Sequence, residues 1–169
     1  VIPTVSSVTT SSTNGNYKAG QIIPIIVTFS EPVTVTGTPH LTVETGTSDA
    51  VVSYASGSGT STLTFNYTIG AGENSVDLNY VSTTALALNS GTINDLGNNP
   101  ATLTLPALNA AASLGGSANI VIDTQVPSLS SVRISSSNAN TSKSKGNDVI
   151  SVSITASESI ATPTVTIAG

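Results

Sequence analysis

The stretch Thr62-Leu63-Thr64-Phe65-Asn66-Tyr67-Thr68-Ile69 alternates hydroxyl or amide side chains with large apolar ones. Successive side chains of a β-strand point to opposite faces of its sheet, so the four apolar residues share one face. This alternation predicts a half-buried strand whose apolar face lies against the core of an all-β domain.

Similar patterns surround this stretch. His40–Glu44 and Asp77–Tyr80 alternate in the same way, and Gln21–Phe29 is dense in Ile and Val, which predicts a central strand. Pro24 interrupts that strand and has no N–H to donate, so we expect a bulge there, or a stretch where that side of the strand has no partner. Further strands are predicted at Thr4–Thr9, Ala50–Tyr54, Ala101–Leu105 and Ala118–Ile122.

Helical signals are weak by comparison. Asn109–Leu114 is predicted to form one turn, ended by Gly115-Gly116, and Leu86–Leu88 is predicted to form another. The remaining chain consists of short strand patterns separated by clusters of Gly, Asn and Ser, which favour turns. This organisation predicts an all-β sandwich.

The composition excludes several classes of function. Only 8% of the 169 residues are charged, whereas Ser and Thr together make up 53 of them. The absence of cysteine excludes disulfide scaffolds, cysteine zinc sites and iron–sulfur clusters. Four basic residues and a net charge of −5 argue against nucleic acid as a partner, and the apolar runs are too short for membrane insertion.

We do not expect an enzyme. His40 is the only histidine, and its place in a Thr/His/Thr alternation predicts a side chain that faces solvent. Gly57-Ser58-Gly59 resembles part of a nucleophile elbow but lacks the strand–turn–helix context of that motif. The chain starts at Val1 rather than at methionine, so we expect a processed protein or a fragment.

An internal repeat organises the chain. Ile2–Val8 matches Val126–Val132 at an offset of 124 residues, and Thr38–Val43 matches Thr162–Ile167 at the same offset. Between these segments, Thr28–Glu31 matches the segment that ends at Glu158, with a local slip of three residues.

The repeat predicts two units of unequal completeness. One unit is predicted at residues 1–123, and an incomplete second unit at residues 124–169 stops after its third strand. A sandwich cut at that point would expose its inner apolar face. We therefore expect either further chain after Gly169 or strands from another chain to complete it.

Three segments carry a family resemblance. They are Phe29-Ser30-Glu31-Pro32-Val33, Asn94-Asp95-Leu96-Gly97-Asn98 and Ile122-Asp123-Thr124-Gln125-Val126-Pro127. Together they resemble the tandem bacterial immunoglobulin-like (Big-type) repeats of large surface and adhesion proteins. The resemblance implies an immunoglobulin-like β-sandwich repeat that is secreted or lies at a bacterial cell surface. It also implies neighbouring immunoglobulin-like repeats of the same chain as partners.

Acidic residues at these motifs form the candidate site. Glu31, Asp95 and Asp123 lie after the second strand, in a late loop and at the exit of the last strand, and Asn98 or Asn99 adds an amide oxygen. Because Ca²⁺ takes six to eight oxygen ligands, convergence of these residues at one end predicts a calcium site that stiffens the junction to the next unit. The alternative is structural, with Asp95 and Asn98 forming a turn, Asp123 capping a loop and Glu31 solvated.

Three functions stay open. The first is a non-catalytic structural or adhesive module that acts as a stalk or spacer, with a host-surface or matrix ligand as a further partner. The second is a self-assembling extracellular filament or sheath subunit, completed by strands of a neighbouring copy. The third is a carbohydrate-binding module, for which Tyr17 and Tyr54 are the remaining aromatic candidates because Phe65 and Tyr67 are predicted to face inward.

Overall fold

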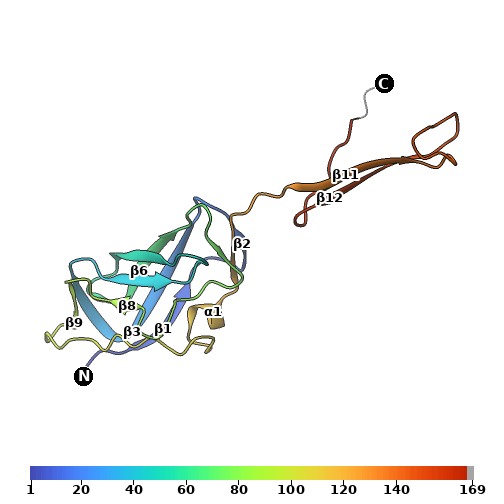
Figure 1. Ribbon diagram of the computed structural model, residues 1–169. Coiled ribbons are helices and arrows are strands. Elements are labelled where there is room, and N and C mark those ends of the chain that lie inside the picture. Colours follow the sequence, from blue (N-terminus) through green and yellow to red (C-terminus); the bar gives the residue numbers. More distant parts are fainter. Residues whose placement is uncertain (167–169) are drawn as a thin grey trace. The chain divides into compact units, whose positions relative to one another are not determined.

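The computed structural model describes residues 1–166, and it is almost entirely β (Figure 1). The chain forms two units, Val1–Thr124 and Gln125–Gly169, which we call the first unit and the second unit. The first unit contains one short helix, α1 (Leu114–Ser117). Its strands are β1 (Val5–Thr10), β2 (Gly15–Tyr17), β3 (Ile22–Thr36), β4 (His40–Val43), β5 (Ala50–Ser56), β6 (Thr60–Thr68), β7 (Asn74–Ser75), β8 (Leu86–Ala87), β9 (Thr92–Asp95) and β10 (Ile120–Asp123).

The strands of the first unit form two sheets. The larger sheet has the order β1-β3-β6-β5-β4-β8, with β9 also paired to β3, and its pairings are antiparallel. The smaller sheet has the order β2-β10-β7, in which β2 and β10 run parallel. Side chains of both sheets contribute to one buried apolar cluster. The predicted all-β, sandwich-like class is therefore confirmed.

The strand that decided the prediction lies inside the larger sheet. β6 runs between β3 and β5, and its residues Leu63, Phe65 and Tyr67 are at most 1% exposed. The residues between them are exposed or half-buried. The ring of Phe65 meets the ring of Tyr54 edge-on, with a centroid separation of 6.1 Å. The predicted alternation of buried and outward-facing side chains is confirmed.

β3 is longer than predicted because it changes partners midway. Its first part pairs with β1 and β6, and its last four residues pair with β9. The register with β6 runs without a shift from Ile22 to Thr28, so Pro24 causes no bulge. Instead, the ladder with β1 ends at Ile25, and Pro24 lies just beyond it, where no N–H is needed on that side.

Two predicted strands are wrong. Ala101–Leu105 and Asp77–Tyr80 each form only an isolated bridge. In the second segment, the Leu78 N–H donates to Ile120 of the smaller sheet, whereas Tyr80 bridges to the larger sheet. The two apolar side chains are buried as the alternation predicted, but the backbone connects two sheets instead of continuing one.

The helical predictions are also wrong. Leu86 and Ala87 form β8 and pair with β4. The helix α1 begins where the predicted turn ends, because Asn109 has a φ of 63° and Ser113 caps α1 by accepting from the Gly116 N–H at 3.1 Å. Gly115 and Gly116 lie inside α1 and do not end it, and a Cβ on Gly116 would collide with the Ala110 carbonyl.

The described part of the second unit is one antiparallel hairpin. It consists of β11 (Leu129–Ser136) and β12 (Ile150–Ala156). The segment after β12 forms no further strand as far as Thr166. The predicted match over Thr162–Ile167 ends at Ile167, which lies outside the described residues.

This hairpin repeats β1 and the first half of β3. Val8 faces Val27 in the first unit, and Val132 faces Ile154 in the second, with offsets of 124 residues for β11 and 127 residues for β12. A register shift interrupts both ladders at the same place, between the first and third residues of β1 and of β11. The internal repeat therefore extends from the sequence to the strand register.

Side-chain hydrogen bonds recur at the same offsets. The Ser6 hydroxyl donates to the Thr28 carbonyl at 3.0 Å, and in the second unit the Ser130 hydroxyl donates to the Thr155 carbonyl at 3.1 Å. The Thr4 N–H donates to the Ser30 hydroxyl at 3.0 Å, as the Ser128 N–H does to the Ser157 hydroxyl at 3.0 Å. The Lys18 N–H donates to the Gln21 side chain at 2.8 Å, as the Lys145 N–H does to the Asp148 carboxylate at 2.8 Å.

Candidate functional site

Asp95 closes a tight turn at the end of β9. The residue is 5% exposed, and its carboxylate accepts two hydrogen bonds from Asn99, from the backbone N–H at 2.8 Å and from the side-chain amide at 2.7 Å. Asn98 has a φ of 65°, a left-handed conformation that Asn adopts more readily than most residues. The Asp95-Leu96-Gly97-Asn98 segment therefore builds a turn in which the acid is satisfied by its own loop.

These hydrogen bonds also set the charge of Asp95. The side chain and then the backbone of Asn99 hold the pKa of Asp95 below its ordinary value, and burial opposes them only in part. The carboxylate is consequently ionised at neutral pH. Each of its oxygens already accepts one bond, so a cation would have to share them with Asn99.

Glu31 lies at the same end of the first unit as Asp95. It belongs to the part of β3 between the residues that pair with β1 and those that pair with β9. Val33, two residues further along, pairs with Asp95. The Oε1 atom of Glu31 is buried and has no hydrogen-bond partner among residues 1–166, although the residue as a whole is partly exposed.

Asp123 lies at the other end of the first unit. It pairs with Asn74, beyond the C-terminal end of β6, whereas Asp95 pairs with Val33, which faces the first residue of β6. β6 has nine residues and spans about 30 Å. The structure therefore brings three of the four predicted ligands to one end and the fourth to the opposite end. One ion cannot contact all of them.

The described chain also contains no ready-made cluster of strong metal ligands. Within residues 1–166, no group of three or more His, Cys, Asp or Glu side chains is close enough to hold a metal ion. Over the same residues, no helix is long and apolar enough to cross a membrane. Calcium binding stays a prediction, and any site at the junction would have to use ligands other than Asp95.

A partly buried polar pair, Tyr67 and Glu73, lies beside the C-terminal end of β6. The Tyr67 hydroxyl donates to the Glu73 carboxylate at 2.7 Å, and the Gly70 N–H donates to the same oxygen at 2.6 Å. Burial raises the pKa of Tyr67, and the hydrogen bond and charge of Glu73 raise it further. The Thr124 hydroxyl donates to the Glu73 carbonyl at 2.9 Å and accepts from the Gly72 N–H at 3.0 Å. These contacts fix the point where the chain leaves the first unit.

The sequence did not single out this pair. Tyr67 follows from the alternation of β6, but nothing in its spacing from Glu73 identifies the partner. The signal available was the Gly70-Ala71-Gly72 turn, which returns the chain toward the strand it has just left.

The other candidate side chains take part in local contacts. The Nε2 atom of His40 lies 3.1 Å from the Asn89 side-chain amide. The Tyr17 hydroxyl donates to a carbonyl of its own loop at 2.6 Å, and the Tyr54 hydroxyl accepts from the Ser58 N–H at 2.8 Å. Both tyrosines are partly buried, so they give the carbohydrate-binding interpretation no added support.

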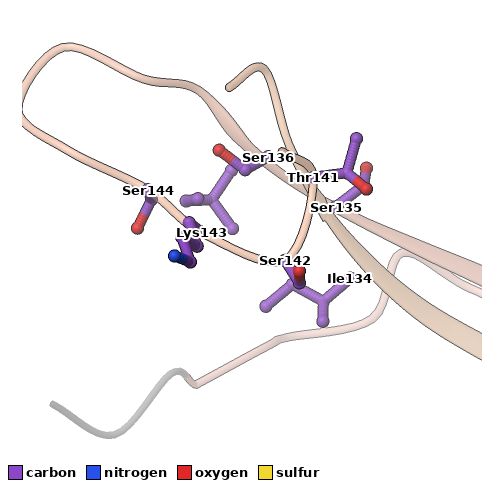
Figure 2. Close-up of a pocket in the computed structure, with 8 residues that line it drawn as sticks. Ile134, Ser135, Ser136, Thr141, Ser142, Lys143 and Ser144 are labelled. Carbon is purple, nitrogen blue, oxygen red and sulfur yellow. The ribbon is translucent and has the colours of Figure 1, made fainter. Parts of the chain in front are cut away.

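The second unit contains a pocket of about 440 Å³ beneath the loop that joins β11 to β12 (Figure 2). Ile134 and Ile150 line it from the strands, and Lys143 lines it from the loop together with several hydroxyl side chains. By the repeat offset, Ile150 corresponds to Ile23, which is 0% exposed in the first unit. One wall of the pocket therefore corresponds to a wall of the core in the first unit.

No protein-family model, no curated protein and no solved structure matches this chain. The resemblance to bacterial immunoglobulin-like repeats consequently stays a prediction.

Proposed function

We propose that the first unit is a non-catalytic spacer or adhesive module of a large bacterial cell-surface or extracellular protein, built as an immunoglobulin-like repeat. Its partners are neighbouring repeats of the same chain, and a host-surface or matrix ligand is a further partner. No catalytic step is assigned to any of its residues.

The observation that carries this proposal is the position of the two chain ends of the first unit. Thr4 bonds to Ser30 near Asp95, at the end where the chain enters. Thr124 bonds to Gly72 at the opposite end, where the chain leaves (Figure 1). The two chain ends of the first unit are thus separated by about the length of β6, roughly 30 Å. A spacer requires this arrangement.

The composition supports the same role. Hydroxyl side chains make the outward faces of the strands polar without charge, and Thr also favours extended backbone. Few surface ion pairs are available for salt to screen. The chain contains no Cys or Met, the residues most easily oxidised outside the cell.

A filament or sheath subunit is the second candidate, and one observation favours it. Val132 and Ile134 of the second unit are 59% and 68% exposed. An apolar hairpin with a free strand edge is a template for pairing with another chain. Such pairing between copies would build an assembly from this chain alone.

Cell labelling and domain replacement test the proposal. Antibodies raised against the first unit should label intact, unpermeabilised cells that produce the protein, and labelling only after lysis would contradict a surface role. Replacement of residues 1–124 in the parent protein by an unrelated β-sandwich of similar length should preserve adhesion if the unit is a spacer. Loss of adhesion after this replacement would identify the unit as the adhesive surface instead.

A further inference from the structure

One edge of β12 has no partner within the described residues. β12 pairs with β11 on one side, and these two strands make up the whole sheet. The equivalent part of β3 pairs with β1 on one side and with β6 on the other. Because β11 corresponds to β1, the free edge of β12 corresponds to the edge that β6 occupies in the first unit.

The apolar face of β12 is also more exposed than its counterpart in the first unit. Its residues Ile150, Val152 and Ile154 are exposed or only half-buried. The equivalent positions of β3 are each 0% exposed, and they are Ile23, Ile25 and Val27. In the first unit these three side chains lie beside alternating Tyr, Phe and Leu residues of β6. The described part of the second unit thus contains the equivalent of β3 but no equivalent of β6.

We propose that the free edge of β12 binds an antiparallel β-strand patterned like β6, in the register of the β3–β6 pair. In this register, the bound strand sets its Leu, Phe and Tyr positions opposite Ile154, Val152 and Ile150. Such strand binding follows from the geometry of the hairpin and is independent of whether the first unit acts as a spacer.

The chemistry of the partner follows from the two strands of the known pair. Neither β6 nor β12 contains a charged residue, so the partner is an uncharged extended segment in which large apolar residues alternate with Thr, Ser or Asn. A second copy of the described chain does not offer its own β6, because that strand is already paired with β3 and β5. The free β12 of a second copy lacks the Leu, Phe and Tyr of β6, so the occupant is a separate segment with the β6 pattern.

A peptide titration tests the proposal on the full chain. The probe is a synthetic peptide with the sequence of residues 60–69, added to ¹⁵N-labelled protein. The control peptide has the same composition, but its Leu, Phe, Tyr and Ile are placed next to one another, so that no register presents all of them on one face. Amide hydrogen exchange across Ile150–Thr155 should slow by at least about tenfold with the probe and remain unchanged with the control peptide.

Two variants locate the binding edge. Ile154→Asp, on the apolar face of β12, should abolish the protection by the probe, whereas Ser153→Asp, on the opposite face, should retain most of it. No protection at millimolar probe, or equal protection by both peptides, would overturn the proposal. Protection that grows with protein concentration in the absence of peptide would also overturn it, because it would assign the edge to a second copy.

Discussion

Val8 and Val132 are the same residue type at equivalent positions of the two units, but their exposure differs. Val8 is 0% exposed in the core of the first unit, and Val132 is 59% exposed. Val8→Ala removes two buried carbons, which costs about 1.6 kcal/mol in transfer free energy, and the cavity raises the total to roughly 2.5 kcal/mol. Val132→Ala removes carbons that are mostly in water, so its cost is about 0.6 kcal/mol and falls on the hairpin alone.

Urea unfolding followed by tyrosine fluorescence separates these effects. The signal reports only the first unit, because all the tyrosines lie there, at Tyr17, Tyr54, Tyr67 and Tyr80. With a denaturant slope of about 1.5 kcal/mol per M, Val8→Ala should lower the midpoint by roughly 1.7 M, and Val132→Ala should leave it unchanged.

Either of two results would refute this reasoning. A Val8→Ala shift smaller than roughly 0.3 M would mean that β1 does not close the core of the first unit. Equal shifts for Val8→Ala and Val132→Ala would mean that the second unit unfolds together with the first. In that case the hairpin would not be a separate, uncovered copy of β1 and β3.

The remaining predictions concern turns, buried polar groups and calcium. Gly57→Ala should cost at least about 2 kcal/mol in urea unfolding, because its φ is 112° and a Cβ would strike the backbone of β6, whereas Gly59→Ala, which opens onto free space, should cost about 1 kcal/mol. Tyr67→Phe should cost about 1–2 kcal/mol in the same assay, since it removes a donor to the partly buried Glu73 carboxylate. The folded-state pKa of Tyr67 is raised above its unfolded value of 10.0, so unfolding releases its proton at high pH. Wild-type stability should therefore fall above pH 10 more steeply than that of Tyr67→Phe, by up to about 1.4 kcal/mol per pH unit. The pKa of Asp95 is lowered in the folded state, so Asp95→Ala should reduce stability at pH 7, and urea midpoints should converge with wild type as the pH falls below about 4. Thermal midpoints in millimolar Ca²⁺ and in chelator test the calcium prediction: a higher midpoint with Ca²⁺ would support a calcium site, and equal midpoints would contradict it.

Much of the fold could be predicted from side-chain alternation. The burial of Leu63, Phe65 and Tyr67 followed from their spacing alone, because a strand with one face in the core needs that period. The repeat also carried over to the structure, since equal spacing of apolar residues in β1 and β11 sets the same register. Local pattern was sufficient wherever a strand paired with its neighbours along its whole length.

Prediction was wrong where one segment serves two partners. Asp77–Tyr80 has the alternation of a strand, but its backbone bonds to both sheets, and alternation reports burial rather than hydrogen-bond partners. The length of β3 was missed for a related reason, since β9 replaces β1 as its partner beyond Phe29. Such exchanges depend on contacts between residues far apart in the chain.

The candidate site, like the fold, could be predicted only in part. The turn chemistry of Asp95 and Asn98 could be predicted from the motif, because Asp and Asn bond to nearby backbone. Which end of the unit each acid occupies could not be predicted, because that depends on the direction of the strands that carry it. Asp123 was expected beside the others and lies about one strand length away.

The register of the second hairpin is the most direct test of the account. Cross-strand nuclear Overhauser effects in the full chain should connect Val132 with Ile154 and Arg133 with Ser153, with an interruption between Leu129 and Ser131. Those contacts would match the β1–β3 ladder at the repeat offsets and establish the second unit as the same two-strand start. Contacts shifted by one residue, or none between β11 and β12, would contradict the repeat and the strand-binding edge that follows from it.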